Sequence, residues 1–169
     1  MEGFRFAPPY ELPRYAYVIA PELRGQAAGR YPVVIVGAGP AGLTLACDLA
    51  QRGVRAVLID EDDTVGVRGA SSRGICYAQK SLEILDRLGL AERAIAKGVA
   101  WSRGRTFSGM EEVYAFDLQD DSVSTQPPFI NLQQYHFEKY LVDRVMELQA
   151  QGKPIEIRGG SKVTVVEAL

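Results

Sequence analysis

Histidine and cysteine, which build many nucleophilic and zinc sites, are nearly absent from this sequence. One histidine, His136, and two cysteines, Cys47 and Cys76, occur among 169 residues. A lone histidine argues against a histidine-dependent catalytic triad and against a histidine-rich metal site. The two cysteines match neither a CxxC pair nor another metal-ligand spacing, so we expect two unpaired thiols and no bound metal.

A dominant charge and a long apolar run are also missing. Nineteen Lys and Arg residues stand against 21 Asp and Glu, which gives a formal net charge of -2 without a basic block. Nucleic acids and membranes are therefore not expected partners. No apolar run approaches the ~20 residues of a transmembrane helix, and residues 1–9 lack the uninterrupted apolar core of a signal peptide. We expect a globular, cytoplasmic protein.

What the sequence does contain is a glycine-rich turn between two short apolar runs. Residues 33–36 lead into Gly37-Ala38-Gly39-Pro40-Ala41-Gly42, a helical pattern follows, and a second apolar run, 56–59, ends in Asp60. Gly37 permits a tight turn, Gly39 lets the backbone approach a pyrophosphate, and Gly42 lets the helix pack on the strand. Pro40 suits the start of a helix, whose N-terminus favours a phosphate. The pattern predicts a Rossmann-like dinucleotide-binding βαβ unit.

Asp60 stands at the end of the second strand, 18 residues after Gly42. Its carboxylate is expected to accept hydrogen bonds from the ribose hydroxyls of an adenosine moiety. The acidic residues that follow, Glu61, Asp62 and Asp63, would repel a 2′-phosphate, which argues against NADP at this site. A solvent-exposed acidic turn is the alternative interpretation, and it applies more to Glu61 than to Asp60. Both are kept as candidate cofactor-binding residues.

The rest of the sequence divides into a proline-rich arm and a mixed α/β region. Residues 1–31, with prolines at positions 8, 9, 13 and 21, predict an extended N-terminal arm. One helix is predicted at 79–88, and a second long helix is predicted to end near residue 149. Short antiparallel strands are predicted within 99–118, and two closing strands at 154–158 and 162–166. The apolar stripes of the two helices are Leu82, Leu85 and Leu88 in the first, and Phe137, Leu141, Val145 and Leu148 in the second.

These motifs together resemble the FAD-dependent aromatic hydroxylases, the class A flavoprotein monooxygenases that include phenol and 3-(3-hydroxyphenyl)propionate hydroxylases. The resemblance covers about residues 32–168. GAGPAG with Asp60 is similar to the family's first FAD motif, although Glu is commoner at that position. Residues 72–76 followed by 81–89 are similar to the family's arginine loop and helix. The pattern Gln134-x3-Glu138-x2-Leu141 is similar to the segment whose glutamine contacts the cofactor.

The resemblance implies a role for two further residues. Arg73 is expected near the FAD phosphates and ribityl chain, and Gln134 in contact with the flavin cofactor, with Gln133 as the adjacent alternative. An ordinary solvated loop arginine and a plain helix residue are the other interpretations of Arg73 and Gln134. The resemblance also implies FAD as the cofactor, NAD(P)H as a transient reductant and hydroxylation of a small aromatic substrate.

The family's second and third FAD motifs, of GDG and GDA type, would follow Leu169. We therefore expect residues 32–169 to form the N-terminal portion of an FAD-binding domain, completed by a missing C-terminal region or a partner chain, and inactive by itself. No catalytic residue is assigned and no oligomeric state is predicted. Two other hypotheses stay open, a noncatalytic nucleotide-binding fragment or subunit and an NAD-dependent dehydrogenase. The antiparallel segment at 99–118 argues against the dehydrogenase.

Overall fold

The glycine-rich turn lies in a βαβ unit, as its sequence predicts. The computed structural model describes residues 19–27, 29–62, 74–118 and 124–168. Strand β1 (Val33–Val36), helix α1 (Pro40–Gln51) and strand β2 (Ala56–Ile59) follow one another, and β1 pairs with β2 in parallel. The predicted Rossmann-like α/β fold class is confirmed.

The parallel sheet has the strand order β1-β2-β8, with β8 (Ile155–Arg158) pairing beside β2. Ala56 is in register with Val33 on one side and with Ile155 on the other. Because β2 is the central strand, its first three residues are buried, which explains an apolar run without alternation. The carboxyl ends of all three strands meet at one edge of the sheet, where ligands bind in open α/β folds.

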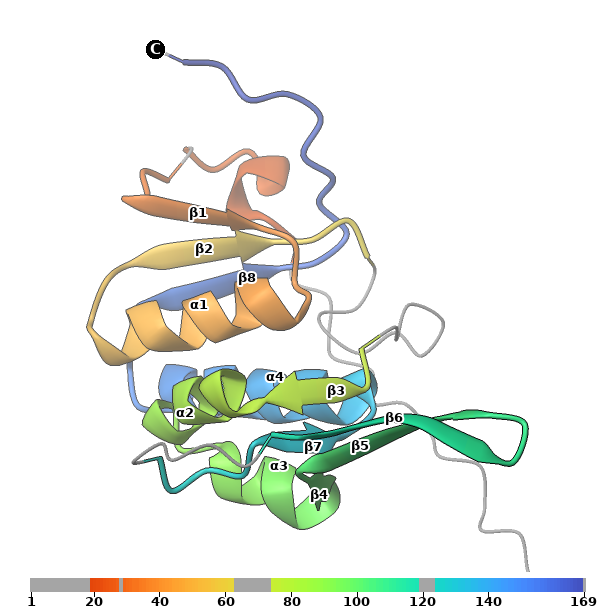
Figure 1. Ribbon diagram of the computed structural model, residues 1–169. Coiled ribbons are helices and arrows are strands. Elements are labelled where there is room, and N and C mark those ends of the chain that lie inside the picture. The colour runs from red at the N-terminus through yellow and green to blue at the C-terminus, as the bar shows by residue number, and fades with distance from the viewer. Residues whose placement is uncertain (1–18, 28, 63–73, 119–123, 169) are drawn as a thin grey trace, which may run out of the picture.

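Two helices pack along each other against one face of this sheet (Figure 1). Helix α1 buries Leu43, Ala46, Cys47 and Ala50, and small side chains in this set allow a close approach to α4 (Gln134–Ala150). The predicted apolar stripe of α4 is confirmed, since all four of its residues are buried. Gly53 follows α1 with φ +73°, a conformation that ends a helix at low cost for glycine. No helix in the described ranges is long and apolar enough to cross a bilayer.

Between β2 and β8 the chain inserts an antiparallel region. One sheet has the order β3-β7-β4, formed by Cys76–Ala78, Phe129–Asn131 and Val99–Trp101. A hairpin pairs β5 (Arg103–Ser108) with β6 (Glu111–Asp117). Helix α2 (Gln79–Arg87) buries the predicted leucines, whereas the short helix α3 (Ala91–Lys97) is not predicted from the sequence. The antiparallel insertion expected at 99–118 is therefore present and larger than expected.

The second closing strand, predicted at 162–166, is wrong. These residues form no regular element, and the side chains from Thr164 to Val166 are exposed. Their β-branched residues favour extended backbone, but an extended segment becomes a strand only when a neighbour completes its hydrogen bonds. None of the described segments pairs with it.

The arm predicted to be extended contains a short helical turn in its described part. Turn η1 (Pro21–Arg24) begins at a proline and precedes Gly25 in the left-handed conformation. It is held to β8 by Arg158, which donates to Glu22 at 2.8 Å and to the Tyr31 hydroxyl at 2.8 Å. Tyr31 in turn donates to Glu156 at 2.8 Å. Glu22 and Tyr31 therefore join the described part of this arm to β8.

Candidate nucleotide-binding site

The three glycines of the turn occupy three different environments. Gly37 has φ +99°, and its N–H donates to the carbonyl of Ile59 at 2.8 Å. A Cβ on Gly39 would meet nothing within 4 Å, so the space in front of it is open. A Cβ on Gly42 would lie 2.0 Å from the Gly37 carbonyl oxygen. The turn therefore needs Gly37 for its backbone conformation and Gly42 for close packing, and it leaves room for a ligand at Gly39.

Helix α1 begins at this turn and directs its N-terminus toward the open space. Gly39 is the N-cap, Pro40 is the first helical residue, and the N–H of Leu43 donates to the Gly39 carbonyl at 3.0 Å. The first N–H groups of a helix have no acceptor within the helix, and the macrodipole places partial positive charge there. The backbone around Ala41 and Gly42 thus suits an anion such as a pyrophosphate.

Asp60 follows β2 and converges on the same turn. Its Oδ2 accepts the Ala38 N–H at 2.5 Å, and its Oδ1 accepts the Asp62 N–H at 2.9 Å. A carboxylate offers about four acceptor positions, so two backbone contacts leave capacity for two ribose hydroxyls. The structure brings together Asp60 and the glycine turn, which are 18 residues apart in the sequence.

A cavity of about 270 Å³ opens at this edge of the sheet. The residues that line it include Gly37, Asp60, Glu61, Ser161 and Lys162. The exposed Glu61 carboxylate pairs with the Lys162 ammonium at 2.9 Å, and this pairing raises the pKa of Lys162. Glu61 therefore stands at the rim of the cavity, where its charge is partly offset.

Gln134 lies with Gly74 at a separate corner, at the start of α4. Its Oε1 accepts the Gly74 N–H at 2.8 Å, and its Nε2 donates to Glu138 at 2.7 Å. Gln134 is half-buried, whereas the adjacent Gln133 is exposed. Arg73, the other residue assigned by resemblance, lies outside the described residues.

Glu138, which the sequence places in a motif without giving it a role, accepts a hydrogen bond from Gln134. Its side chain is buried, with 2% of the residue exposed. Burial raises the pKa of Glu138, the hydrogen bond from Gln134 opposes this, and the charge of Asp60 adds to it. Its neighbour Tyr77 has a pKa raised to about 12, first by burial and then by the charge of Glu138. The signal in the sequence is the i, i+4 spacing of Gln134 and Glu138, which places both on one helix face.

The sequence matches a family of known proteins. A protein-family model described as "FAD binding domain" matches residues 30–167. The chain belongs to the FAD binding domain family. Anhydrotetracycline monooxygenase of Streptomyces rimosus is 32% identical over 139 residues, which is 82% of this chain and 25% of that protein.

Solved structures give the same relationship. The p-nitrophenol 4-monooxygenase PnpA from Pseudomonas putida DLL-E4 superposes with a TM-score of 0.64 at 30% identity, covering 76% of this chain and 31% of that one. The flavin-dependent monooxygenase PieE, solved with FAD and substrate, gives a TM-score of 0.64 at 27% identity, with 80% and 24% covered. The FAD binding domain described here therefore spans about a quarter to a third of the length of these relatives.

The residues of this FAD binding domain fit the adenosine diphosphate part of FAD. Gly39 has no side chain to block a phosphate, and the N-terminus of α1 lies at the same place. The Asp60 carboxylate, beside a cavity, can accept hydrogen bonds from a ribose. Gln134 and Gly74 are hydrogen bonded at a separate corner, where the charge of Asp60 adds to the raised pKa of Glu138.

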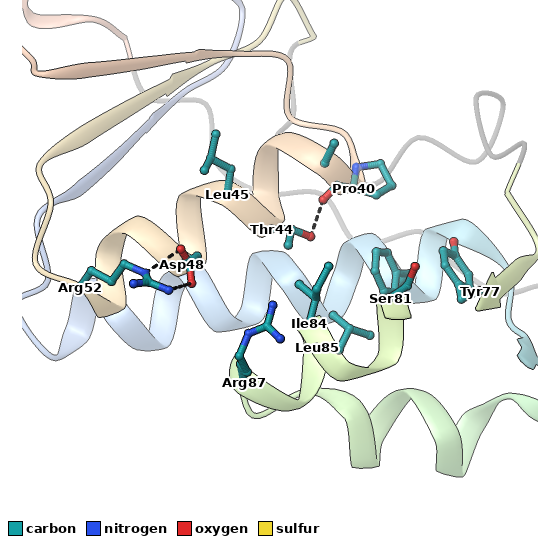
Figure 2. Close-up of a pocket in the computed structure, with 12 residues that line it drawn as sticks. Pro40, Thr44, Leu45, Asp48, Arg52, Tyr77, Ser81, Ile84, Leu85 and Arg87 are labelled. Atoms are coloured by element: carbon teal, nitrogen blue, oxygen red, sulfur yellow. Dashed lines mark hydrogen bonds and ion pairs between the residues drawn. The ribbon is translucent and has the colours of Figure 1, made fainter. Parts of the chain in front are cut away.

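A larger cavity, of about 500 Å³, lies beside the turn and is lined mostly by apolar groups. In Figure 2, Pro40 and Thr44 of α1 face Ile84 and Leu85 of α2 across it. Tyr77 stands at one end of the cavity, and the ion pair between Asp48 and Arg52, 2.8 Å long, stands at the other. This cavity touches the first residues of α1 but contains neither Gly37 nor Asp60.

The thiols and the histidine are not among the residues that line the cavity at Gly37 and Asp60. Cys47 and Cys76 are both free, which confirms the prediction of unpaired thiols. Cys47 is buried, and burial raises its pKa to about 12, whereas Cys76 is exposed. His136 is buried on α4, and burial with nearby Lys97 and Lys139 lowers its pKa.

Proposed function

We propose that this FAD binding domain holds the adenosine diphosphate part of FAD in an NAD(P)H-consuming aromatic hydroxylase. The observation that carries the proposal is the convergence of three features at the carboxyl edge of the parallel sheet. These are the open approach at Gly39, the N-terminus of α1 and the Asp60 carboxylate, which together match a pyrophosphate and a ribose. The acidic residues after β2 favour FAD or NAD over NADP at this site.

The reaction class follows from the relatives. PnpA is named for p-nitrophenol, an aromatic substrate, and anhydrotetracycline monooxygenase also bears a monooxygenase name. FAD supplies the oxygen-transfer chemistry in such enzymes, while the protein supplies binding, orientation and exclusion of water. In this chain Gly39, Asp60 and Gln134 have the binding role. The proposal includes the remainder of the FAD site, from a further region or a partner chain, and a cytoplasmic location.

Absorbance and titration calorimetry on the purified protein test the binding step. Oxidised flavin absorbs visible light and NAD does not, so a yellow protein with stoichiometric FAD supports the proposal over an NAD-dependent dehydrogenase. Loss of a hydrogen bond to a charged acceptor costs about 1.5–3 kcal/mol, so Asp60→Ala should raise the Kd for FAD about 10- to 150-fold. Asp86→Ala on α2 is a matched control, expected to bind FAD as the parental protein does. An unchanged Kd in Asp60→Ala would overturn the assignment.

A product assay tests the reaction class. With the further region or partner chain that completes the FAD site present, NAD(P)H oxidation should depend on a phenolic compound such as p-nitrophenol, and chromatography should detect a hydroxylated product in proportion to NAD(P)H consumed. Residues 1–169 alone should form no such product. FAD binding by the completed protein without any such product across a panel of phenols would favour the noncatalytic nucleotide-binding subunit.

A further inference from the structure

Helix α4 carries a buried glutamate, Glu138, one turn after Gln134. Glu138 is 2% exposed, and its Oε1 accepts the Gln134 amide at 2.7 Å. Its Oε2 has no hydrogen-bond partner among the described residues. A buried carboxyl group with one unsatisfied oxygen is costly, and apolar groups of similar shape fill such positions without that cost. Its retention needs a reason beyond packing.

The reason lies in the orientation of Gln134. A glutamine amide has an acceptor end and a donor end, and here each end meets its complement. The Gly74 N–H donates to Oε1 at 2.8 Å, and Nε2 donates to Glu138 at 2.7 Å. Without Glu138 the donor end loses this buried acceptor, and the amide loses one of the contacts that fix its orientation.

This corner adjoins the nucleotide site. The Tyr77 hydroxyl lies 3.4 Å from the position of a Cβ on Gly74, and Tyr77 shares the 500 Å³ cavity with Pro40 and Ala41 at the start of α1. The ring of Tyr77 stacks on Phe137, the residue before Glu138, with centroids 4.5 Å apart. Glu138 therefore lies one helical turn after Gln134 and next to Phe137, which lines the same cavity as the start of α1.

We infer that Glu138 is a positioning residue, which holds the Gln134 amide in the orientation that meets the flavin side of FAD. The inference rests on the proposed function. Glu138 itself is not expected to touch the cofactor, because only 2% of the residue is exposed. Its removal therefore weakens binding of the flavin side of FAD. Binding of the adenosine diphosphate side, which Gly39 and Asp60 contact, is unchanged.

Calorimetric titration of the purified protein with FAD and with ADP separates the two sides. In Glu138→Met the Kd for FAD should rise about 3- to 10-fold, as expected for one lost hydrogen bond, while the Kd for ADP stays within about twofold of parental. Glu138→Gln keeps a carbonyl acceptor for Gln134 and should restore the Kd for FAD to within about twofold. The Tm of Glu138→Met should equal or exceed the parental Tm, because methionine removes an unsatisfied buried oxygen.

A matched control and a second variant keep the test decisive. Glu147→Met, at a partly exposed position of α4 that pairs with Arg93 and Arg144, should change neither Kd. Gln134→Met should give the same loss as Glu138→Met, and the double variant should lose no more than either single variant.

Three outcomes would overturn the inference. The first is an FAD affinity within twofold of parental in Glu138→Met or in Gln134→Met. The second is an equal loss of FAD and ADP together with a lower Tm, which is the signature of a purely structural residue. The third is a parental protein that binds neither ligand, which would overturn the proposed function as well.

Discussion

Alanine at Gly42 should destabilise the fold, although alanine is the better helix former. The Cβ of the new residue would lie 2.0 Å from the Gly37 carbonyl oxygen, about 1 Å closer than the 3.0 Å limit of real Cβ contacts. The obstructing atom belongs to the backbone of the turn, so no side-chain rotation relieves the contact. The Ile35 side chain, with its Cγ2 3.3 Å from the same position, closes the other direction.

Two opposing effects set the size of the loss. Overpacking against rigid neighbours costs about 3 kcal/mol, the upper part of the usual range. Replacing glycine by alanine within a helix returns about 1 kcal/mol. The net loss of about 2 kcal/mol corresponds to a fall in Tm of about 4–8 °C for a chain of this size.

Thermal unfolding followed by circular dichroism measures this fall. The matched control is Gly39→Ala, three residues earlier, where a Cβ meets nothing within 4 Å. It should cost no more than about 1 kcal/mol, from the poorer N-cap, and should instead weaken FAD binding. A Tm of Gly42→Ala at or above that of Gly39→Ala would refute the claim that the strand and helix approach too closely for a side chain.

Three further predictions concern other parts of the molecule. Iodoacetamide should alkylate Cys76 and leave Cys47 unmodified in the folded protein, because Cys47 is buried with a pKa raised to about 12. Mass spectrometry measures the alkylation of each cysteine. Labelling of Cys47 at the rate of Cys76 would contradict the prediction. The folded state raises the pKa of Glu138 above its ordinary 4.5, so above that pH the unfolded chain loses this proton first and the parental protein loses stability relative to Glu138→Met. Urea unfolding should therefore show the difference in free energy of unfolding between the two proteins widening as pH rises. A difference independent of pH would oppose the burial argument. Arg158→Met should speed proteolysis within residues 19–31, since Arg158 joins Glu22 and the Tyr31 hydroxyl to the sheet. The surface variant Arg93→Met is the control. Equal digestion rates of the two variants would show that the segment is held by other contacts.

The nucleotide site can be predicted from the sequence because its residues lie close together along the chain. Gly37, Gly39 and Gly42 lie within six consecutive residues, and Asp60 follows the next strand, so one βαβ unit fixes their positions relative to each other. Apolar spacing likewise predicts the buried faces of α2 and α4, because helical periodicity alone decides which residues share a face. Arg73 and the 63–73 segment lie outside the described residues, so that assignment stays a prediction.

Contacts between distant segments are what only the tertiary structure decides. Gln134 is distinguished from Gln133 by its bond to Gly74, 60 residues earlier, and by the burial of Glu138 behind it. The β-branched residues at 162–166 favour a strand, yet no described segment pairs with them and no strand forms. A periodic pattern specifies which face of an element is apolar, but the partner that covers that face or completes its hydrogen bonds is chosen by the whole fold. The sequence by itself therefore determined the turn, the helix and the carboxylate of the nucleotide site, and the tertiary structure decided which side chains support them.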